Sequence, residues 1–281
     1  ADNSLRLIKL SNCGYEVPVA VGANESLEGV FESAPAFIHG DNGIGNVILP
    51  ESSQKPLDEK AEDFIIRKAN ELNGELIIIT TGRMTNLAKA YLKDPELPKK
   101  VKKVVSMGGC IDVPGNINNY AEANIHGDAK AADVVFGAGF HLTLVGLDVT
   151  MKTFITDRDV RNLCEYASEE CKPIAEYIRE VLKFYFEFHR VSMGMANACV
   201  VHDPLAMLIA EDPSLGIYKM IRASVEYEHE PFKGMIKKDM GFVPNLDREE
   251  IAACISVNSE VAVRRLFAVF QDMTPGRYNW K

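Results

Sequence analysis

Long hydrophobic runs are missing from this sequence. Uninterrupted apolar stretches such as Leu76–Ile79 are short, whereas a membrane-spanning helix needs roughly 20 apolar residues. Basic residues are also scarce, because 31 Lys and Arg stand against 40 Asp and Glu, a formal net charge of −9. Nucleic-acid binding depends on basic side chains that release counterions, so this balance disfavours it. The sequence predicts a small molecule or another subunit as partner, and neither a membrane nor a nucleic acid.

Cysteine pairs at metal-binding or redox spacing are absent. The six cysteines are dispersed without any Cys-x-x-Cys, at positions 13, 110, 164, 171, 199 and 254. Several lie in apolar stretches, which favours reduced core thiols over disulfides or zinc ligands. No signal peptide opens the chain, so we expect a cytoplasmic protein. The sequence starts at Ala1 and not at a methionine, and we therefore expect that an upstream segment is missing.

The glycine fingerprints of nucleotide-binding proteins are absent as well. The glycine-rich loop Gly40–Gly45 is neither G-x-G-x-x-G after a strand nor a P-loop, and both patterns need their glycines at fixed offsets to bind phosphate. A plain surface turn is the expected structure of this loop. A dinucleotide-dependent oxidoreductase is disfavoured for the same reason.

Helical and strand-like apolar periods alternate along the chain. We expect helices near residues 4–10, 61–72, from 85, 128–135, through most of 157–189, from 203 and at 260–270, and strands at 18–21, 76–80, 104–107, 142–147, 223–225, 235–236 and 252–257. Strands that are apolar on both faces predict an α/β fold with a mostly parallel central sheet flanked by helices. With 281 residues, no repeat and no linker, a single domain over residues 1–281 is expected.

Polar residues gather just after these strands, where open parallel sheets bind their ligands. They are Thr81, the loop residues from Met107 to Asn124, and the run Val201-His202-Asp203-Pro204. Each has an ordinary alternative when taken alone. His202 could be a satisfied, half-buried histidine, Asp203 a helix N-cap, Glu122 and Asn124 groups that satisfy loop backbone, and Met107 a core residue.

The order of these fragments resembles the inosine-uridine-preferring nucleoside hydrolase family. The matching blocks are Val17–Gly22, His39-Gly40, Gly43–Gly45, Thr81–Ala88, Met107–Gly109, Gly115-Asn116, Ala121–Asn124, Asp128–Ala132, Gly146–Thr150 and Val201–Pro204. The resemblance implies the Rossmann-like nucleoside hydrolase fold, with a helical segment near the active site. It also implies hydrolysis of ribonucleosides to ribose and free base, through an oxocarbenium-like transition state as in inverting glycosidases.

The resemblance also implies roles for individual residues. Calcium would be bound by the Asp203 carboxylate and the Thr81 backbone carbonyl, since calcium prefers oxygen ligands. Ribose would contact Met107, Asn116, Glu122 and Asn124. His202 would protonate or stabilise the leaving base, and His39 would lie near that base. Tyr185 and His189 fall where some relatives place aromatic residues against the base, although an aromatic stripe at helical spacing is more often core.

Two departures from the family pattern affect these expectations. The amino-terminal strand ending in Asp-x-Asp-x-Gly-x-Asp-Asp, which supplies the general base and most calcium ligands, is absent from the sequence. We hypothesise that the parent protein carries it, because losing a central strand would leave its neighbours with unpaired edges and marginal stability. Ala123 replaces the aromatic residue that relatives usually carry between the glutamate and the asparagine, which loosens the sugar pocket.

Two functions stay open at this point. The first is a calcium-assisted ribonucleoside hydrolase acting on inosine-type and uridine-type substrates, assembled as a homodimer or homotetramer as relatives usually are. The second is a catalytically inactive, nucleoside- or ribose-binding family member that lacks the general base and part of the metal site. Metal content discriminates them, because Asp203 and one carbonyl are too few for the 6–8 oxygens that calcium prefers.

Overall fold

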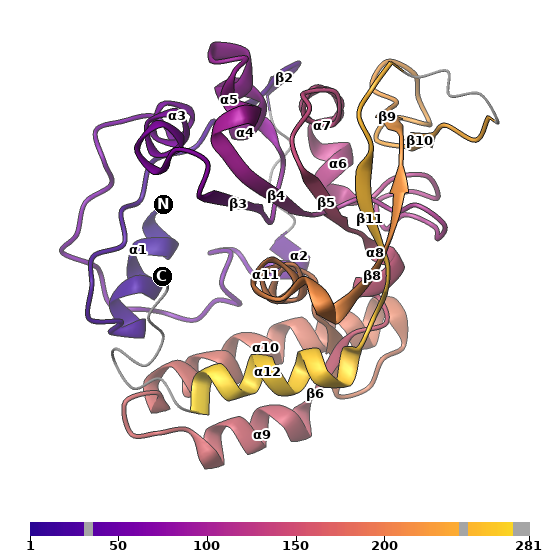
Figure 1. The fold of residues 1–281 in the computed structure, drawn as a ribbon. Coiled ribbons are helices and arrows are strands. Elements are labelled where there is room, and N and C mark those ends of the chain that lie inside the picture. The colour runs from indigo at the N-terminus through magenta and orange to yellow at the C-terminus, as the bar shows by residue number, and fades with distance from the viewer. Residues whose placement is uncertain (31–35, 242–246, 272–281) are drawn as a thin grey trace.

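The structure, a computed structural model, describes residues 1–30, 36–241 and 247–271. Its centre is a five-stranded sheet with the strand order β3-β4-β5-β11-β8. The strands are β3 (Leu76–Thr80), β4 (Val101–Met107), β5 (Leu142–Val145), β11 (Ile251–Val257) and β8 (Gly216–Ile221). The first four run parallel, and β8 pairs antiparallel with β11. The predicted mostly parallel sheet flanked by helices is confirmed (Figure 1).

Alternate residues of the central strands face two different helical layers. Val104 and Leu144 pack in the apolar cluster that contains α3 (Ala61–Leu72), α4 (Thr85–Lys93) and α7 (Ala129–Phe136). Their neighbours Val105 and Val145 pack in a second cluster, with α11 (Asp203–Glu211) and α12 (Ser259–Gln271). Successive side chains of a strand point to opposite faces. Both faces of the sheet are therefore buried, which explains the apolar strands.

The parallel register brings the carboxyl ends of three strands to one edge. Thr80 lies opposite Ser106, and Met107 lies opposite Val145. The residues that directly follow β3, β4 and β5 therefore leave the sheet on the same side.

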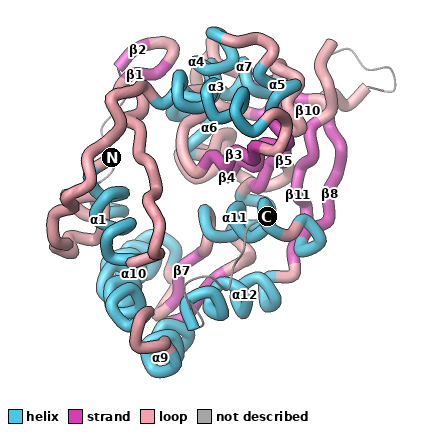
Figure 2. The backbone as a smooth tube through the Cα atoms, turned by 60° about the vertical axis from the view of Figure 1, so that its left-hand side comes forward, coloured by secondary structure: helices cyan, strands magenta, loops and turns pink. Residues whose placement is uncertain are grey.

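A further helical layer lies below the sheet in Figure 1. It contains α9 (Asp157–Tyr166) and the long α10 (Lys172–Met193), with the antiparallel pair β6 (Phe154–Thr156) and β7 (Ala198–Val200) beside them. The amino-terminal helix α1 (Asp2–Ser11) and the short α2 (Ala36–His39) both contact α10. Figure 2 shows that loop accounts for most of the described chain between α1 and α3. Helix α10 thus contacts both the amino-terminal region and the helices below the sheet.

The remaining elements are short. They are β1 (Glu25–Ser26), β2 (Gly29–Val30), α5 (Leu97–Lys100), α6 (Ala123–Gly127), α8 (Leu147–Thr150), the 3-10 helix Pro213–Leu215, β9 (Ala223–Val225) and β10 (Ile236–Lys238). Two of them, α6 and α8, follow β4 and β5 along the chain and belong to the candidate site described below.

The expected strand at 18–21 is wrong. Only Val21 forms a bridge, to Lys60, and the backbone carbonyls of Val19 and Val21 accept hydrogen bonds from Leu57 and Ala61. This segment therefore pairs with the approach to α3 and not with the sheet. The strand β8 was not predicted, because its side chains are mostly exposed or half-buried and give no continuous apolar run.

The free edge of β3 is only partly covered. In the described part of the chain β3 pairs with β4 alone, and Ile77 on it remains 39% exposed. Unpaired strand edges of this kind favour aggregation.

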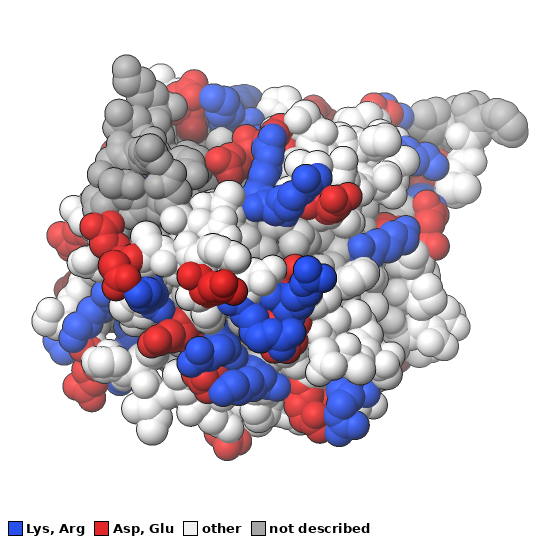
Figure 3. Space-filling model, turned by 90° about the horizontal axis from the view of Figure 1, so that it is seen from below, with Lys and Arg blue, Asp and Glu red and all other residues white. Residues whose placement is uncertain are grey.

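The surface of the lower helical layer carries charges of both signs. In Figure 3 blue and red side chains are intermixed on that face, and pairs such as Lys183 with Glu180 and Arg190 with Glu187 join neighbouring turns of α10. Among the described residues, none of the helices is both long enough and apolar enough to span a bilayer.

Candidate active site

A loop after β4 brings four of the predicted site residues together. Met107 is the last residue of β4, and the chain then turns through Gly108 and Gly109 before reaching Asn116, Glu122 and Asn124. Gly109 has φ +77°, and a Cβ there would lie 2.4 Å from the Ile236 side chain. The turn therefore requires glycine, for backbone conformation and for space.

The buried Glu122 side chain holds this loop together through backbone hydrogen bonds. Its carboxylate accepts hydrogen bonds from the backbone N–H groups of Gly109 at 2.9 Å, Asn124 at 2.9 Å and Ile125 at 3.2 Å. The residue is 2% exposed and is the N-cap of α6. Burial raises the pKa of Glu122, although the three N–H donors oppose that shift. Glu122 thus does satisfy loop backbone, the alternative considered for it, and it also holds a carboxylate at the carboxyl edge of the sheet.

The two asparagines keep one amide atom each without a protein partner. The Asn124 Nδ2 atom lies 3.2 Å from the backbone oxygen of Met107, and the Asn116 Oδ1 atom accepts from the Ala123 N–H at 2.9 Å. In the described chain, neither Asn124 Oδ1 nor Asn116 Nδ2 has a hydrogen-bond partner. An amide oxygen and an amide N–H donor therefore remain for a ligand with hydroxyl groups.

His202 precedes α11 and is tied to α8. Its Nδ1 lies 2.8 Å from the Thr150 hydroxyl, and the residue is half-buried. Burial, together with charge on His189, lowers the pKa of His202 to about 4. The imidazole is therefore neutral near pH 7, and its Nε2 makes no hydrogen bond to the described residues.

Asp203 begins α11 without capping it. The N-cap is His202, no side-chain capping bond forms, and within the described residues the Asp203 carboxylate has no hydrogen-bond or ion-pair partner. The alternative that Asp203 is simply an N-cap is therefore wrong. Solvent reaches the side chain, but surrounding protein and the negative charge of Glu122 raise the pKa of Asp203 to about 6. This interaction connects the start of α11 with the loop after β4.

An aromatic group on α2 and α10 lies within electrostatic reach of the Asp203 carboxylate. The rings of His39 and Tyr185 stack with centroids 6.1 Å apart and an interplanar angle of 18°, and Phe188 continues the stack at 6.1 Å from Tyr185. Burial raises the pKa of Tyr185, with smaller contributions from the charges of Cys199 and Asp203. Partial enclosure by protein lowers the pKa of His39. Two predicted base-pocket residues, His39 and Tyr185, are thus brought together.

His189 is enclosed in the core and both its nitrogens are used. Its ring is 0% exposed, Nδ1 lies 2.9 Å from the Tyr185 carbonyl, and Nε2 accepts from the Val200 N–H at 3.3 Å. Since Nε2 accepts, Nδ1 carries the proton and donates. His189 therefore offers no nitrogen to a ligand, and its geometry is that of a structural residue, the more frequent case for such a stripe.

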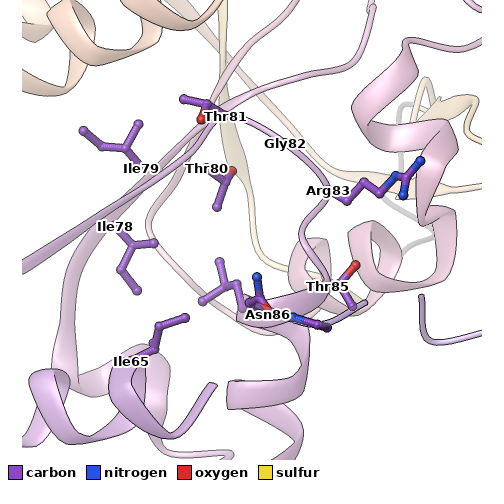
Figure 4. Close-up of a pocket in the computed structure, with 11 residues that line it drawn as sticks. Ile65, Ile78, Ile79, Thr80, Thr81, Gly82, Arg83, Thr85 and Asn86 are labelled. Atoms are coloured by element: carbon purple, nitrogen blue, oxygen red, sulfur yellow. Dashed lines mark hydrogen bonds between the residues drawn. The ribbon is translucent and has the colours of Figure 1, made fainter. Parts of the chain in front are cut away.

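Thr81 directly follows β3 and lies at a cavity beside the open edge of that strand. The cavity has a volume of about 420 Å³ and is lined by residues of β3, α3, α4 and the intervening turn, including Ile65, Ile78, Thr80 and Asn86 (Figure 4). Of the predicted site residues, Thr81 alone lines it. The Thr80 hydroxyl is buried there, and none of the described residues forms a hydrogen bond with it. Within the described residues no hydrogen bond or charge interaction joins Thr81 to Asp203.

The described residues do not form a complete calcium site. Residues 1–30, 36–241 and 247–271 contain no group of three or more His, Cys, Asp or Glu side chains placed to hold a metal ion. Asp203 supplies one unpaired carboxylate, while Glu122 is occupied by three backbone N–H groups. A calcium ion prefers 6–8 oxygen ligands, so these residues alone do not fit it.

Two residues of the site received no role from the sequence. Asp148 on α8 accepts from the Ile111 and Asp112 N–H groups at 2.8 Å each and so fixes the loop after β4. Thr150, two residues further on the same short helix, binds the His202 ring. Both lie in the Gly146–Thr150 block, so the signal was present, but only tertiary contacts reveal what each side chain binds.

Comparisons with known proteins agree with this arrangement. The family model described as inosine-uridine preferring nucleoside hydrolase matches residues 1–264. Uridine nucleosidase 1 of Arabidopsis thaliana is 39% identical over 218 residues, which is 77% of this chain and 63% of that protein. The chain thus spans somewhat less than two thirds of the length of this relative.

Solved structures with a similar fold cover almost the whole chain. A purine-preferring ribonucleoside hydrolase from Gardnerella vaginalis superimposes with a TM-score of 0.89 at 32% identity, covering 98% of this chain and 85% of that one. The plant nucleoside hydrolase PpNRh1 gives a TM-score of 0.88 at 32% identity, covering 96% and 84%. On the evidence of the matched residues and the shared fold, the chain belongs to the inosine-uridine preferring nucleoside hydrolase family.

Proposed function

We propose that this protein hydrolyses the N-glycosidic bond of ribonucleosides and releases ribose and the free base. The observation that carries the proposal is the pairing of a neutral histidine, His202, with an adjacent unpaired carboxylate, Asp203, beside the loop of Glu122. Family membership and relatives named as a uridine nucleosidase and a purine-preferring hydrolase support it.

The chemistry requires stabilisation of two opposite charges. As the bond between sugar and base breaks, its electron pair stays on the base and positive charge develops on the ribose ring. The carboxylates of Glu122 and Asp203 provide negative potential for the sugar cation. A neutral His202 donates a hydrogen bond to the departing base and keeps its own proton, as neutral imidazoles do in other enzymes. Water forms the new bond to the ribose carbon, and the proton that it loses is taken up by the departed base anion.

We assign the ribose hydroxyls to the loop after β4. The free Asn124 Oδ1 accepts and the free Asn116 Nδ2 donates, which suits vicinal hydroxyl groups that are themselves both donors and acceptors. Met107 lies against Asn124, with its sulfur 3.2 Å from Nδ2, and would contact the apolar side of the sugar. On the base side we assign His39 and Tyr185, whose stacked rings present flat surfaces to a nucleobase. Inosine and uridine are the substrates we propose.

We propose calcium as the cofactor, with Asp203 and the Thr81 carbonyl as two of its ligands. An unpaired carboxylate whose pKa is raised to about 6 gains by binding a cation, which supports this role. Because the described residues do not complete the site, further oxygen ligands are required, and the residue roles above involve no metal-dependent step.

We further propose a cytoplasmic single-domain protein that acts in nucleoside salvage as a homodimer or homotetramer. All six cysteines are free thiols, which supports a reducing location. Size-exclusion chromatography with light scattering tests the assembly state.

Ribose release from inosine and from uridine tests the proposed activity. We expect His202→Ala to lower kcat/KM about 100-fold, the size expected for loss of a group that assists the leaving group. His229→Ala is the matched control, since His229 lies on the surface and bonds to Glu226. Equal activity of the two variants would exclude His202 from the reaction.

A second function is favoured by the incomplete metal site. In this alternative the protein binds nucleosides or ribose without turnover. Isothermal titration calorimetry with inosine, performed beside the ribose assay, separates the two: heat of binding without ribose release supports the binding protein, and ribose release excludes it.

A further inference from the structure

A buried hydroxyl contacts the histidine assigned to the leaving base. Thr150 is 0% exposed and is the last residue of α8, the short helix after β5. Its Oγ1 lies 2.8 Å from Nδ1 of His202. Among the described residues this is the one hydrogen bond that the Thr150 hydroxyl makes.

The position of Thr150 is fixed by its backbone. Its N–H donates to the Gly146 carbonyl at 3.1 Å, and its carbonyl accepts from the Thr153 N–H at 3.2 Å. Asp148 in the same helix is anchored through the loop N–H groups at positions 111 and 112. These hydrogen bonds hold the Thr150 hydroxyl in place against the His202 imidazole.

The direction of this hydrogen bond follows from proton accounting. A threonine hydroxyl has one proton to donate, and a buried donor without an acceptor loses the hydrogen bonds it had in water. If Nδ1–H donated to Oγ1, the Thr150 proton would be buried with no acceptor. If the hydroxyl donates to Nδ1, every proton in the contact has a partner.

We propose that Thr150 is a positioning residue that donates its hydroxyl proton to Nδ1 of His202 and so holds the imidazole in the tautomer that carries its proton on Nε2. The role of this tautomer in catalysis rests on the proposed function. The Nε2–H group is then the hydrogen-bond donor for the departing base, and no proton leaves the imidazole during bond cleavage. Thr150 itself does not contact substrate in this account.

The side-chain nitrogen spectrum of His202 tests the tautomer directly. In the unmodified protein at pH 7, we expect nitrogen NMR to show Nδ1 unprotonated and Nε2 protonated, with the signals assigned by their loss in His202→Ala. A spectrum with Nδ1 protonated overturns the proposal, and this measurement requires neither substrate nor a Thr150 variant.

Variants add a functional readout. Thr150→Val removes the hydroxyl at nearly constant shape; we expect mixed His202 tautomers and a fall in kcat of about 10-fold, as for other residues that orient a functional histidine, with KM little changed. Thr150→Ser keeps the hydroxyl and should restore the wild-type tautomer and most of kcat. Thr153→Val is the matched control, because Thr153 is 2% exposed but bonds to Val149 and Ser259.

The outcomes separate this inference from the proposed function. An Nε2–H tautomer in a protein without turnover supports the role of Thr150 and contradicts the hydrolase. Turnover with the opposite tautomer, or with a Thr150→Val variant that matches Thr153→Val in tautomer and kcat, contradicts the role of Thr150 and leaves the hydrolase standing.

Discussion

Two histidines on neighbouring elements have opposite surroundings. His189, inside α10, uses both nitrogens within the protein and is fully buried. His202, before α11, bonds through Nδ1 alone and keeps Nε2 free of the described residues. Histidines with both nitrogens satisfied stabilise a fold, whereas one with a free nitrogen can serve a ligand.

This contrast predicts opposite effects of the same substitution. His189→Ala leaves a cavity and an unpaired Val200 N–H, so we expect the free energy of unfolding to fall by about 2–4 kcal/mol. His202→Ala should lower it less, by about 1–2 kcal/mol, because the buried Thr150 hydroxyl loses its partner, while it abolishes most activity. Urea denaturation of both variants measures the difference. A His202 variant that is the less stable of the two would contradict these assignments.

The sequence predicts local structure well where one residue type fits one local geometry, as at a helix N-cap. A helix was predicted at 128–135, and the Asp128 side chain does cap it by accepting from the Ala131 N–H at 3.1 Å. The sequence does not reveal that Asp203 makes no capping bond, or that Glu122 is buried by three N–H donors. The first depends on the residue at which α11 begins, and the second on how the loop after β4 folds.

At the scale of elements, the site depends on one close approach within the loop after β4. A Cβ on Gly115 would lie 2.0 Å from the backbone oxygen of Ala121. Two segments of the loop therefore pass so close to one another that only glycine fits at this position. The Asn116 and Ala123 bond sits next to this crossing.

Gly115→Ala should therefore displace the ribose side of the site. We expect kcat/KM to fall at least about 10-fold, since small misplacements of binding groups are costly, and the free energy of unfolding to fall by about 1–3 kcal/mol. Gly82→Ala is the stability control, because a Cβ there meets nothing within 4 Å. Thermal unfolding with parallel ribose assays measures both effects. Equal stability of the two variants would contradict the crowding argument.

The apolar periodicity of the sequence predicts some helices and strands correctly and misses others. The amphipathic α3 and the apolar β3 were predicted at their observed bounds, because their burial pattern is set by a continuous core. The predicted strand at 104–107 is the second part of β4, which begins at Val101 with an exposed and a half-buried lysine. β8 is an edge strand with mostly exposed side chains, and the segment at 18–21 pairs outside the sheet. Neither property is encoded in the local apolar pattern.

At the scale of the whole molecule, the open edge of β3 and one predicted calcium ligand meet at the same cavity. The cavity beside β3 contains Thr81, the one predicted calcium ligand outside α11. Asp203 brings a single carboxylate to the carboxyl edge of the sheet. Thr81 and Asp203 together supply too few oxygen ligands for calcium. The metal site therefore remains a prediction, whereas the family and the fold are confirmed.

The most direct test of the proposed function is ribose release from inosine and uridine by the purified protein, with and without a calcium chelator. The proposal predicts turnover that the chelator abolishes and that added calcium restores. A folded protein that releases no ribose from either nucleoside in the presence of calcium would contradict the hydrolase. Chelator-insensitive turnover would retain the hydrolase and contradict the calcium assignment.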